Sequence, residues 1–265
     1  MKDDSTAFVG SMPHYYDTGL GPVLFAEYAR RLGSIVAAYA PATVLEVSAG
    51  TGISSRALKE ALPGADLTIT DLSPEMLALA QPRVPSATFR PADGQDLPFD
   101  DGTFDVVACQ FGAMFFPDLD AAFGEALRVL KPGGHYVFST WDGRQGNPYA
   151  GMVDDLLAED YPTDRPPFFQ VPFRLNDIDA IARRVQRAGF GDVRVTLSGD
   201  APIVQDWATF ATAMINANQT AAQITARGGD PAAFEARLLS AFEAHYGPAP
   251  AAMPMQAIFF EATKP

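Results

Sequence analysis

Short apolar segments alternate with helical segments along most of the chain, and this alternation restricts the fold more than any other feature. The expected strands are TVLEVS, DLTITD, FDVVACQ and HYVFST, all between residues 43 and 140, with helical segments such as SSRALKEAL and LDAAFGEALRVL between them. Strands connected through helices form right-handed crossovers within one sheet. The sequence therefore predicts an α/β fold with a parallel sheet covered by helices on both faces.

The flanking segments complete this organisation. An amphipathic helix is expected over 20–39, and the Pro-rich and aromatic-rich residues 142–174 lose periodicity, which is typical of a functional cover. Helical and strand patterns return from Asn176, the expected cap of the next helix, and include a nearly uncharged helix at 205–219. We therefore expect one catalytic unit in four parts: an N-terminal lid segment and helix (1–40), a core (41–141), an insertion (142–175) and the rest of the core with a helical cap (176–265).

The charge balance and residue usage exclude several classes of protein. The 265 residues carry a net charge of −13, which disfavours nucleic acid and anionic lipid surfaces as partners. No apolar stretch is long enough to cross a bilayer, and the N-terminal residues lack the apolar region of a secretory signal, so a cytoplasmic protein without membrane insertion is expected. The single cysteine, Cys109, excludes an internal disulfide, and the three scattered histidines indicate no metal site.

The turn after the first strand, residues 48–52, has the composition of a ligand-binding loop. Gly50 and Gly52 can adopt positive φ and let a ligand approach the backbone, while Ser48 and Ala49 add little bulk. A dinucleotide site would need a third glycine, where this chain has Ser55. A carboxylate at Glu46, just before the turn, disfavours a phosphate and favours the cationic S-adenosylmethionine.

Two further carboxylates follow in places that suit an adenosyl group. Asp71 ends the second strand, where it can accept hydrogen bonds from ribose hydroxyls, a feature that nicotinamide dinucleotides and S-adenosylmethionine both require. Asp93 begins the loop after ATFRP and is placed to accept from an adenine amino group, with Gly94 and Gln95 offering backbone or amide contacts. Asp93 and Gly94 are equally compatible with a plain turn.

Four segments, taken in order, resemble the class I S-adenosylmethionine-dependent methyltransferases, in particular the ubiquinone and menaquinone biosynthesis type. They are VLEVSAGTG, TDLSPEML, ADGQDLPFDDGTFDVVACQFGAMFFPD and ALRVLKPGGHYVFSTWDGRQGNPY. The resemblance implies a Rossmann-like, mostly parallel seven-stranded sheet with a lid or cap. It also implies these cofactor contacts: Glu46 at the methionine end, the turn from Ser48 to Gly52 beneath the ligand, Asp71 at the ribose, Asp93 and Gly94 at adenine, Leu72 and Met76 as apolar walls, and Gln110 with Phe111 as the floor. One departure is Ser48, where the family usually has glycine.

Methyl transfer from a sulfonium depends mainly on positioning and water exclusion, so a dedicated base is optional. Candidate catalytic contacts are His14, Tyr15 and Tyr16, which the resemblance places in a segment that folds over the methyl donor. His135 and His245 are interpreted as structural. Candidate acceptor-binding residues are Trp141, Asn147, Phe168, Phe169, Phe173, Trp207 and Met214, which favour an apolar or aromatic substrate although packing of the cover explains them as well.

The leading hypothesis is a methyltransferase that moves a methyl group to O, N or C of a small metabolite and releases S-adenosylhomocysteine. A nicotinamide-dependent oxidoreductase is the alternative enzyme class. A protein that binds S-adenosylmethionine without transferring its methyl group is the third reading, because the sequence identifies no indispensable base. The oligomeric state is not fixed by the sequence, and a homodimer stays among the alternatives.

Overall fold

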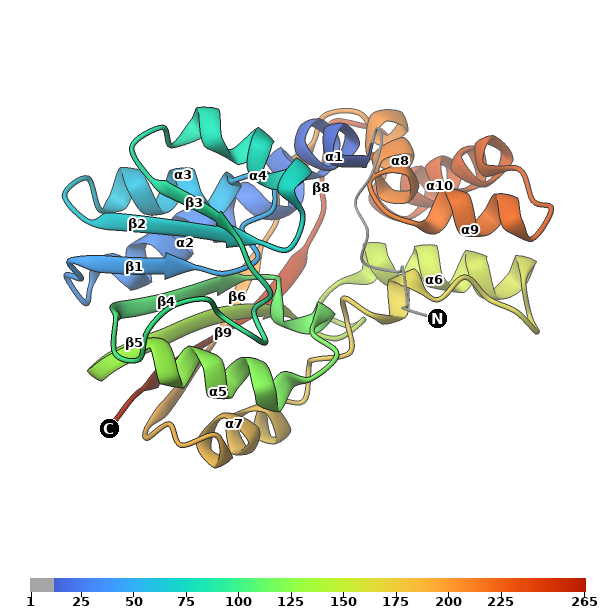
Figure 1. Cartoon of the computed structure of the whole chain (residues 1–265). Helices are drawn as coiled ribbons and strands as arrows, with labels where there is room; N and C mark the ends of the chain where they lie inside the picture. The colour runs from blue at the N-terminus through green and yellow to red at the C-terminus, as the bar shows by residue number, and fades with distance from the viewer. Residues whose placement is uncertain (1–11) are drawn as a thin grey trace.

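A seven-stranded sheet forms the centre of the computed structural model, which describes residues 12–265 (Figure 1). The strand order is β3-β2-β1-β4-β5-β9-β6, and β9 is antiparallel to both of its neighbours while the other pairs are parallel. The strands are β1 (Thr43–Glu46), β2 (Asp66–Asp71), β3 (Thr88–Pro91), β4 (Phe104–Gln110), β5 (Leu130–Trp141), β6 (Val193–Asp200) and β9 (Met255–Thr263). The mostly parallel seven-stranded sheet that the resemblance implies is confirmed.

Helices cover both faces of the sheet, because neighbouring residues on each strand point to opposite sides. Val44 packs with the layer of α2 (Ala26–Ala37), α3 (Ile53–Ala61) and α4 (Pro74–Ala80), whereas Leu45 packs with the layer of α5 (Leu119–Val129) and α7 (Ile178–Arg187). Figure 1 shows these two helical layers above and below the strands. The predicted two-sided covering is therefore confirmed.

A helical cap lies to one side of the sheet (Figure 1). It consists of α6 (Pro148–Asp160), α8 (Trp207–Asn216), α9 (Thr220–Ala226) and α10 (Pro231–Tyr246), and a two-stranded ladder of β7 (Ile203–Val204) and β8 (Ala251–Ala252) lies at its base. Aromatic side chains fill the cap, with Trp207 stacked on Tyr246 at a ring-centroid distance of 5.3 Å and Phe210 against Phe242 at 5.6 Å. No helix within residues 12–265 combines the length and the apolar character needed to span a membrane.

The prediction of an irregular segment over 142–174 is wrong for α6. Tyr149, Val153 and Leu157 are buried at a spacing of four residues, so they form the apolar stripe of a helix that begins at Pro148. The acidic residues Asp154 and Asp155 interrupt the stripe in sequence, and Asp154 is itself buried, which hid the period. After α6 the chain is irregular apart from one turn of 3₁₀ helix, Phe168–Gln170.

The expected cap at Asn176 is also wrong by one residue. The side chain of Asp177 accepts a hydrogen bond from the backbone N–H of Ala180 and caps α7, whereas Asn176 donates to the carbonyl oxygen of Phe173. Asn and Asp are both good N-cap residues, so residue type alone could not decide which of the two caps the helix.

The N-terminal helix begins earlier than expected. It runs from α1 (Met12–Tyr15) through a π-helical segment, η2 (Tyr16–Phe25), into α2, where the sequence predicted a start near residue 20. Gly19 lies so close to α8 that an added Cβ would be 2.3 Å from the Cβ of Ala213. On its other side Gly21 faces Ile53, at the start of α3. The η2 segment therefore fills the space between the cap and the loop that follows β1.

Candidate functional site

The loop after β1 has the left-handed backbone that its composition predicted. Gly50 and Gly52 have φ values of 56° and 83°, and Ser48 adopts φ 58° in spite of its Cβ. Phe111, which follows the adjacent strand β4, also has a positive φ, 52°. Left-handed non-glycine residues cost free energy and concentrate at binding sites. Two of them at the ends of neighbouring parallel strands mark this edge of the sheet as the candidate site.

Asp71 links this loop to the end of β2. Its Oδ2 accepts from the backbone N–H of Gly50 at 2.8 Å, and its Oδ1 accepts from the backbone N–H of Ser73 at 2.9 Å. Burial raises the pKa of the Asp71 carboxyl. Each carboxylate oxygen can accept more than one hydrogen bond, so the geometry leaves Asp71 able to bind a pair of hydroxyl groups.

An apolar surface adjoins this carboxylate. The Leu72 side chain is 67% exposed although it is large and apolar, and Met76, one turn into the next helix, is buried. A single exposed leucine is ordinary on its own. Beside Asp71, at the binding edge of an open α/β sheet, it provides a surface for a flat apolar group.

Glu46 is buried behind the loop, with 2% of its surface exposed. Its two carboxylate oxygens accept hydrogen bonds from the hydroxyl groups of Ser54 and Ser55 in α3. Burial raises the pKa of Glu46 to about 7, and the two serine hydrogen bonds reduce this effect only in part. Ser55, the residue that replaces the third glycine of a dinucleotide motif, thus holds a buried carboxylate, and Glu46 reaches the pocket only through Ser54.

Asp93, Gly94 and Gln95 form a tight turn after β3. One oxygen of Asp93 accepts from the backbone N–H and the side-chain amide of Gln95, at 2.9 and 3.0 Å. The side-chain amide oxygen of Gln95 accepts from the backbone N–H of Asp118. Gly94 packs closely against Phe116, since an added Cβ would lie 2.8 Å from that ring. The three residues therefore lie together at the binding edge of the sheet, beyond the wall of the pocket described next.

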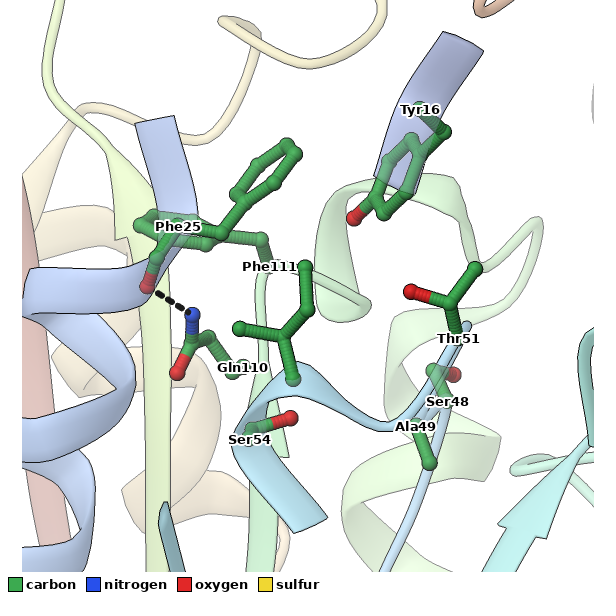
Figure 2. A pocket seen from close by; sticks show the side chains of 9 residues that line it. Tyr16, Phe25, Ser48, Ala49, Thr51, Ser54, Gln110 and Phe111 are labelled. Carbon is green, nitrogen blue, oxygen red and sulfur yellow. Dashed lines mark hydrogen bonds between the residues drawn. The ribbon is translucent and has the colours of Figure 1, made fainter. Parts of the chain in front are cut away.

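A small pocket of about 20 Å³ lies between the loop, the end of β4 and the η2 segment (Figure 2). Predicted site residues in its wall are Tyr16, Ser48, Ala49, Gln110 and Phe111. The wall also contains residues that the sequence analysis did not single out, namely Phe25, Thr51, Ile53 and Ser54. Thr51 and Ser54 had a signal that could have found them, because the start of a helix after a glycine turn is where ligands are bound.

The N-terminal segment closes one side of this pocket. Tyr16 stacks on Phe25 with ring centroids 4.7 Å apart, and Asp17 accepts from the Thr51 hydroxyl at 3.0 Å while also pairing with Arg83. Tyr15 is half-buried next to it, and His14 is exposed. Burial raises the pKa of Tyr16 far above neutrality, so its phenol keeps its proton and is not suited to act as a base.

Aromatic residues continue from the pocket into the cover. Trp141 stacks on Phe111 at 3.9 Å, and Phe173 lies 6.3 Å from Trp141. Phe168 and Phe169 are buried and pack edge to face. Trp141 and Phe173 are thus joined to the pocket through Phe111, but none of these four predicted acceptor-binding residues lines the pocket itself.

The other predicted acceptor-binding residues have structural roles in the fold. Asn147 donates to the carbonyl oxygens of Asp142 and Gln256, so it fastens the start of α6 to β9. The Trp207 indole N–H donates to the carbonyl oxygen of Gly247 within the cap, and Met214 is buried in α8.

The remaining nucleophilic and metal-binding residue types have ordinary surroundings. Cys109 is fully buried in β4, and burial raises the pKa of its thiol to about 12. His135 stacks on Tyr39 at 3.7 Å, at the opposite end of the sheet from the pocket. Within residues 12–265, no three His, Cys, Asp or Glu side chains are grouped as metal ligands would be.

Several known proteins that are similar to this chain are methyltransferases. A sequence model described as a methyltransferase domain matches residues 45–138, which include the loop, Asp71, Asp93 and the end of β4. The demethylmenaquinone methyltransferase of Thermus thermophilus is 40% identical over 115 residues, 42% of this chain and 52% of that protein. The enzyme of the same name from Chlorobaculum tepidum is 44% identical over 91 residues, 34% of this chain and 37% of that protein. The chain thus spans about half or less of the curated relatives it matches.

Solved structures extend the likeness to nearly the whole chain. Phosphoethanolamine N-methyltransferase 2 of Haemonchus contortus, solved with phosphomonomethylethanolamine and S-adenosylhomocysteine, matches with a TM-score of 0.57 and 20% identity over 97% of this chain and 61% of that one. The YcgJ protein of Bacillus subtilis matches with the same TM-score and 18% identity, over 90% of this chain and 98% of that one. At these identities the likeness shows the fold.

The strand order, the reversed β9 and the glycine loop at the binding edge define a class I methyltransferase fold. Residues 45–138 match the sequence model of a methyltransferase domain. The resemblance to the menaquinone and ubiquinone type stated from the sequence is confirmed by the relatives that match it.

Proposed function

We propose that this protein is an S-adenosylmethionine-dependent methyltransferase that methylates O, N or C of a small, apolar or aromatic metabolite. The observation that carries the proposal is the arrangement of Asp71 beside the left-handed Gly50 and the exposed Leu72. These three features together match an adenosyl ligand: the carboxylate can accept from the ribose hydroxyls, the glycine lets the ligand approach the backbone, and the apolar surface can contact the base.

The rate of methyl transfer would depend mainly on how the protein positions the methyl donor and the acceptor. In-line displacement at a sulfonium disperses charge, so a closed site that aligns donor and acceptor supplies much of the rate. Tyr16 and Phe25 of the N-terminal segment close over the pocket and would exclude water, while Phe111 and Trp141 would provide the apolar wall on the acceptor side. No group that lines the pocket in the described chain is a carboxylate or histidine base, which favours an acceptor that ionises readily.

The nicotinamide alternative has less support. Two carboxyl groups, Glu46 and Asp71, lie close to the loop where a pyrophosphate would have to rest, and repulsion would disfavour it. The relatives named above are methyltransferases. The small-molecule partner, a cytoplasmic location and a monomeric or homodimeric state belong to the same proposal.

Calorimetric titration with S-adenosylmethionine and S-adenosylhomocysteine tests the proposal. Both are expected to bind, and NADH is not. Incubation with methyl-labelled S-adenosylmethionine and a panel of phenols, amines and quinols then tests transfer. Binding of NADH without binding of S-adenosylhomocysteine would replace the proposal with the oxidoreductase reading, and tight binding without any label transfer would favour the non-methylating reading.

Replacing Gly50 by alanine is expected to weaken S-adenosylhomocysteine binding at least tenfold. The added Cβ meets nothing within 4 Å in the protein, so it would project into the space that the ligand needs. Gly102→Ala is the matched control, because Gly102 also has positive φ and open surroundings but lies in a turn away from the loop. Both variants should lose about 1 kcal/mol of stability. Calorimetry that finds equal affinities for the two variants would contradict the assignment of the loop.

A further inference from the structure

A second hollow, of about 500 Å³, lies between α5 and α7, on the face of the sheet away from η2. Figure 1 shows these two helices side by side below the strands. We call this hollow the α5–α7 groove, and its lining residues are Asp120, Ala180, Arg184, Arg187 and Ala188. Pockets of roughly 300–1,000 Å³ hold small molecules. The groove is therefore large enough for a metabolite and separate from the pocket under η2.

Two cations at this groove stand apart from the others in the chain. Within residues 12–265, every Lys and Arg side chain except Arg183 and Arg187 forms an ion pair or donates a hydrogen bond. Both side chains are exposed, and residues four apart lie on one face of a helix. The chain as a whole carries a net charge of −13. Its two uncommitted cations are thus concentrated at one place on α7.

The third arginine of α7 is held in a fixed orientation. Nε and Nη2 of Arg184 donate to the two carboxylate oxygens of Asp120, at 2.5 and 3.2 Å, which leaves the N–H groups of Nη1 free. The hydrogen bond from Arg184 lowers the pKa of Asp120, and the charge of Arg187 adds to this effect, so Arg187 lies near the ion pair. Asp118, the other carboxylate near Arg184, caps α5. The positive charges of Arg183 and Arg187 therefore stay uncompensated.

This charge pattern defines the ligand group that fits. A phosphate monoester carries a charge of about −1.5 to −2 at neutral pH and three acceptor oxygens. Two neighbouring guanidinium groups match that charge, and each can donate two parallel hydrogen bonds to phosphate oxygens. Ala180 and Ala188 have short side chains, so the space beside the arginines is open to the rest of the ligand.

We propose that the α5–α7 groove binds a phosphate monoester of a small molecule, with Arg183 and Arg187 as the charge partners and Arg184, held by Asp120, as a further donor. Inorganic phosphate offers the same oxygens, but it would fill only a small part of the groove. An ester with an organic group over the two alanines should therefore bind more tightly. The site lies on the other face of the sheet from η2 and does not depend on the proposed methyl transfer.

NMR titration of the arginine Nε–H resonances, at constant ionic strength, tests the proposal with two probes, phenyl phosphate and inorganic phosphate. We expect a saturable shift of the Arg187 resonance and tighter binding of phenyl phosphate. Arg187→Gln should weaken phenyl phosphate binding about tenfold, through loss of a charge-assisted hydrogen-bond pair. Arg187→Lys keeps the charge without the planar fork, so its affinity should lie between the two. Because Arg187 is exposed and unpaired in the described chain, both variants should keep the wild-type melting temperature.

Arg56→Gln is the matched control, because it removes one exposed positive charge from α3, outside the groove. Its affinity for phenyl phosphate should equal that of the wild-type protein. Shifts that do not saturate, or equal weakening in Arg56→Gln and Arg187→Gln, would show general attraction of anions and overturn the site. Equal affinity for the two probes would overturn the ester and leave a site for free phosphate. Neither probe contains an adenosyl group, so these outcomes leave the proposed function standing.

Discussion

Replacing Asp71 by asparagine is expected to weaken S-adenosylhomocysteine binding about 100-fold. The carboxylate would accept from both ribose hydroxyls, and each such charge-assisted hydrogen bond contributes roughly 1.5 kcal/mol, so about 3 kcal/mol is at stake. An asparagine retains one oxygen for the backbone N–H of Gly50 or Ser73, but it presents an N–H group where the other acceptor stood. Calorimetric titration measures the change.

Asp105→Asn provides the control for this prediction. Asp105 also accepts backbone hydrogen bonds, from Ala42 and Thr43, and pairs with Lys131. It lies at the start of β4, at the other end of the sheet from the pocket. This variant should lose stability and keep its affinity. An Asp71→Asn protein that binds S-adenosylhomocysteine as tightly as the Asp105→Asn protein would rule out the ribose role.

The second large effect concerns Glu46 and pH. Its pKa rises from 4.5 to about 7 on folding because the carboxyl is buried. The folded chain therefore holds a proton that the unfolded chain releases between pH 4.5 and 7, and stability falls as pH rises through that window. Above pH 7 the ionised group costs about 3 kcal/mol, from about 1.4 kcal/mol per pKa unit.

Glu46→Gln removes this ionisation while keeping a side chain that can bond to the hydroxyl groups of Ser54 and Ser55. We expect the variant to be more stable than the wild-type protein at pH 8, by up to about 3 kcal/mol, and to differ little from it at pH 4.5. Urea unfolding at the two pH values measures the difference. A stability difference that is the same at both pH values would show that Glu46 does not titrate on folding in this range.

The sheet and the loop were predictable because they depend on local patterns. Alternating apolar segments predicted the parallel strands, and the glycines at 50 and 52 predicted the left-handed turn that the structure contains. Asp71 was predictable for the same reason, since the residue at the tip of the second strand must lie at the binding edge. Its contact with Gly50 is the direct consequence.

The rest of the site depends on contacts between distant parts of the chain. Tyr16 and Asp17 reach the pocket because η2 crosses the loop, and no local pattern shows which side of the molecule that segment covers. Glu46 was expected beside the ligand, but two serines of the following helix enclose it. Trp207 was expected at the acceptor, yet its indole is used inside the cap, because helical spacing cannot distinguish a substrate wall from a packed helix interface.

The close crossing of η2 and α8 at Gly19 and Ala213 has a kinetic consequence. The same segment contacts the loop at Thr51 and the cap at Ala213, so a displacement of η2 when the methyl donor binds would also change its contact with the cap. Turnover should then follow a compulsory sequence in which the methyl donor associates first and the demethylated nucleoside dissociates last.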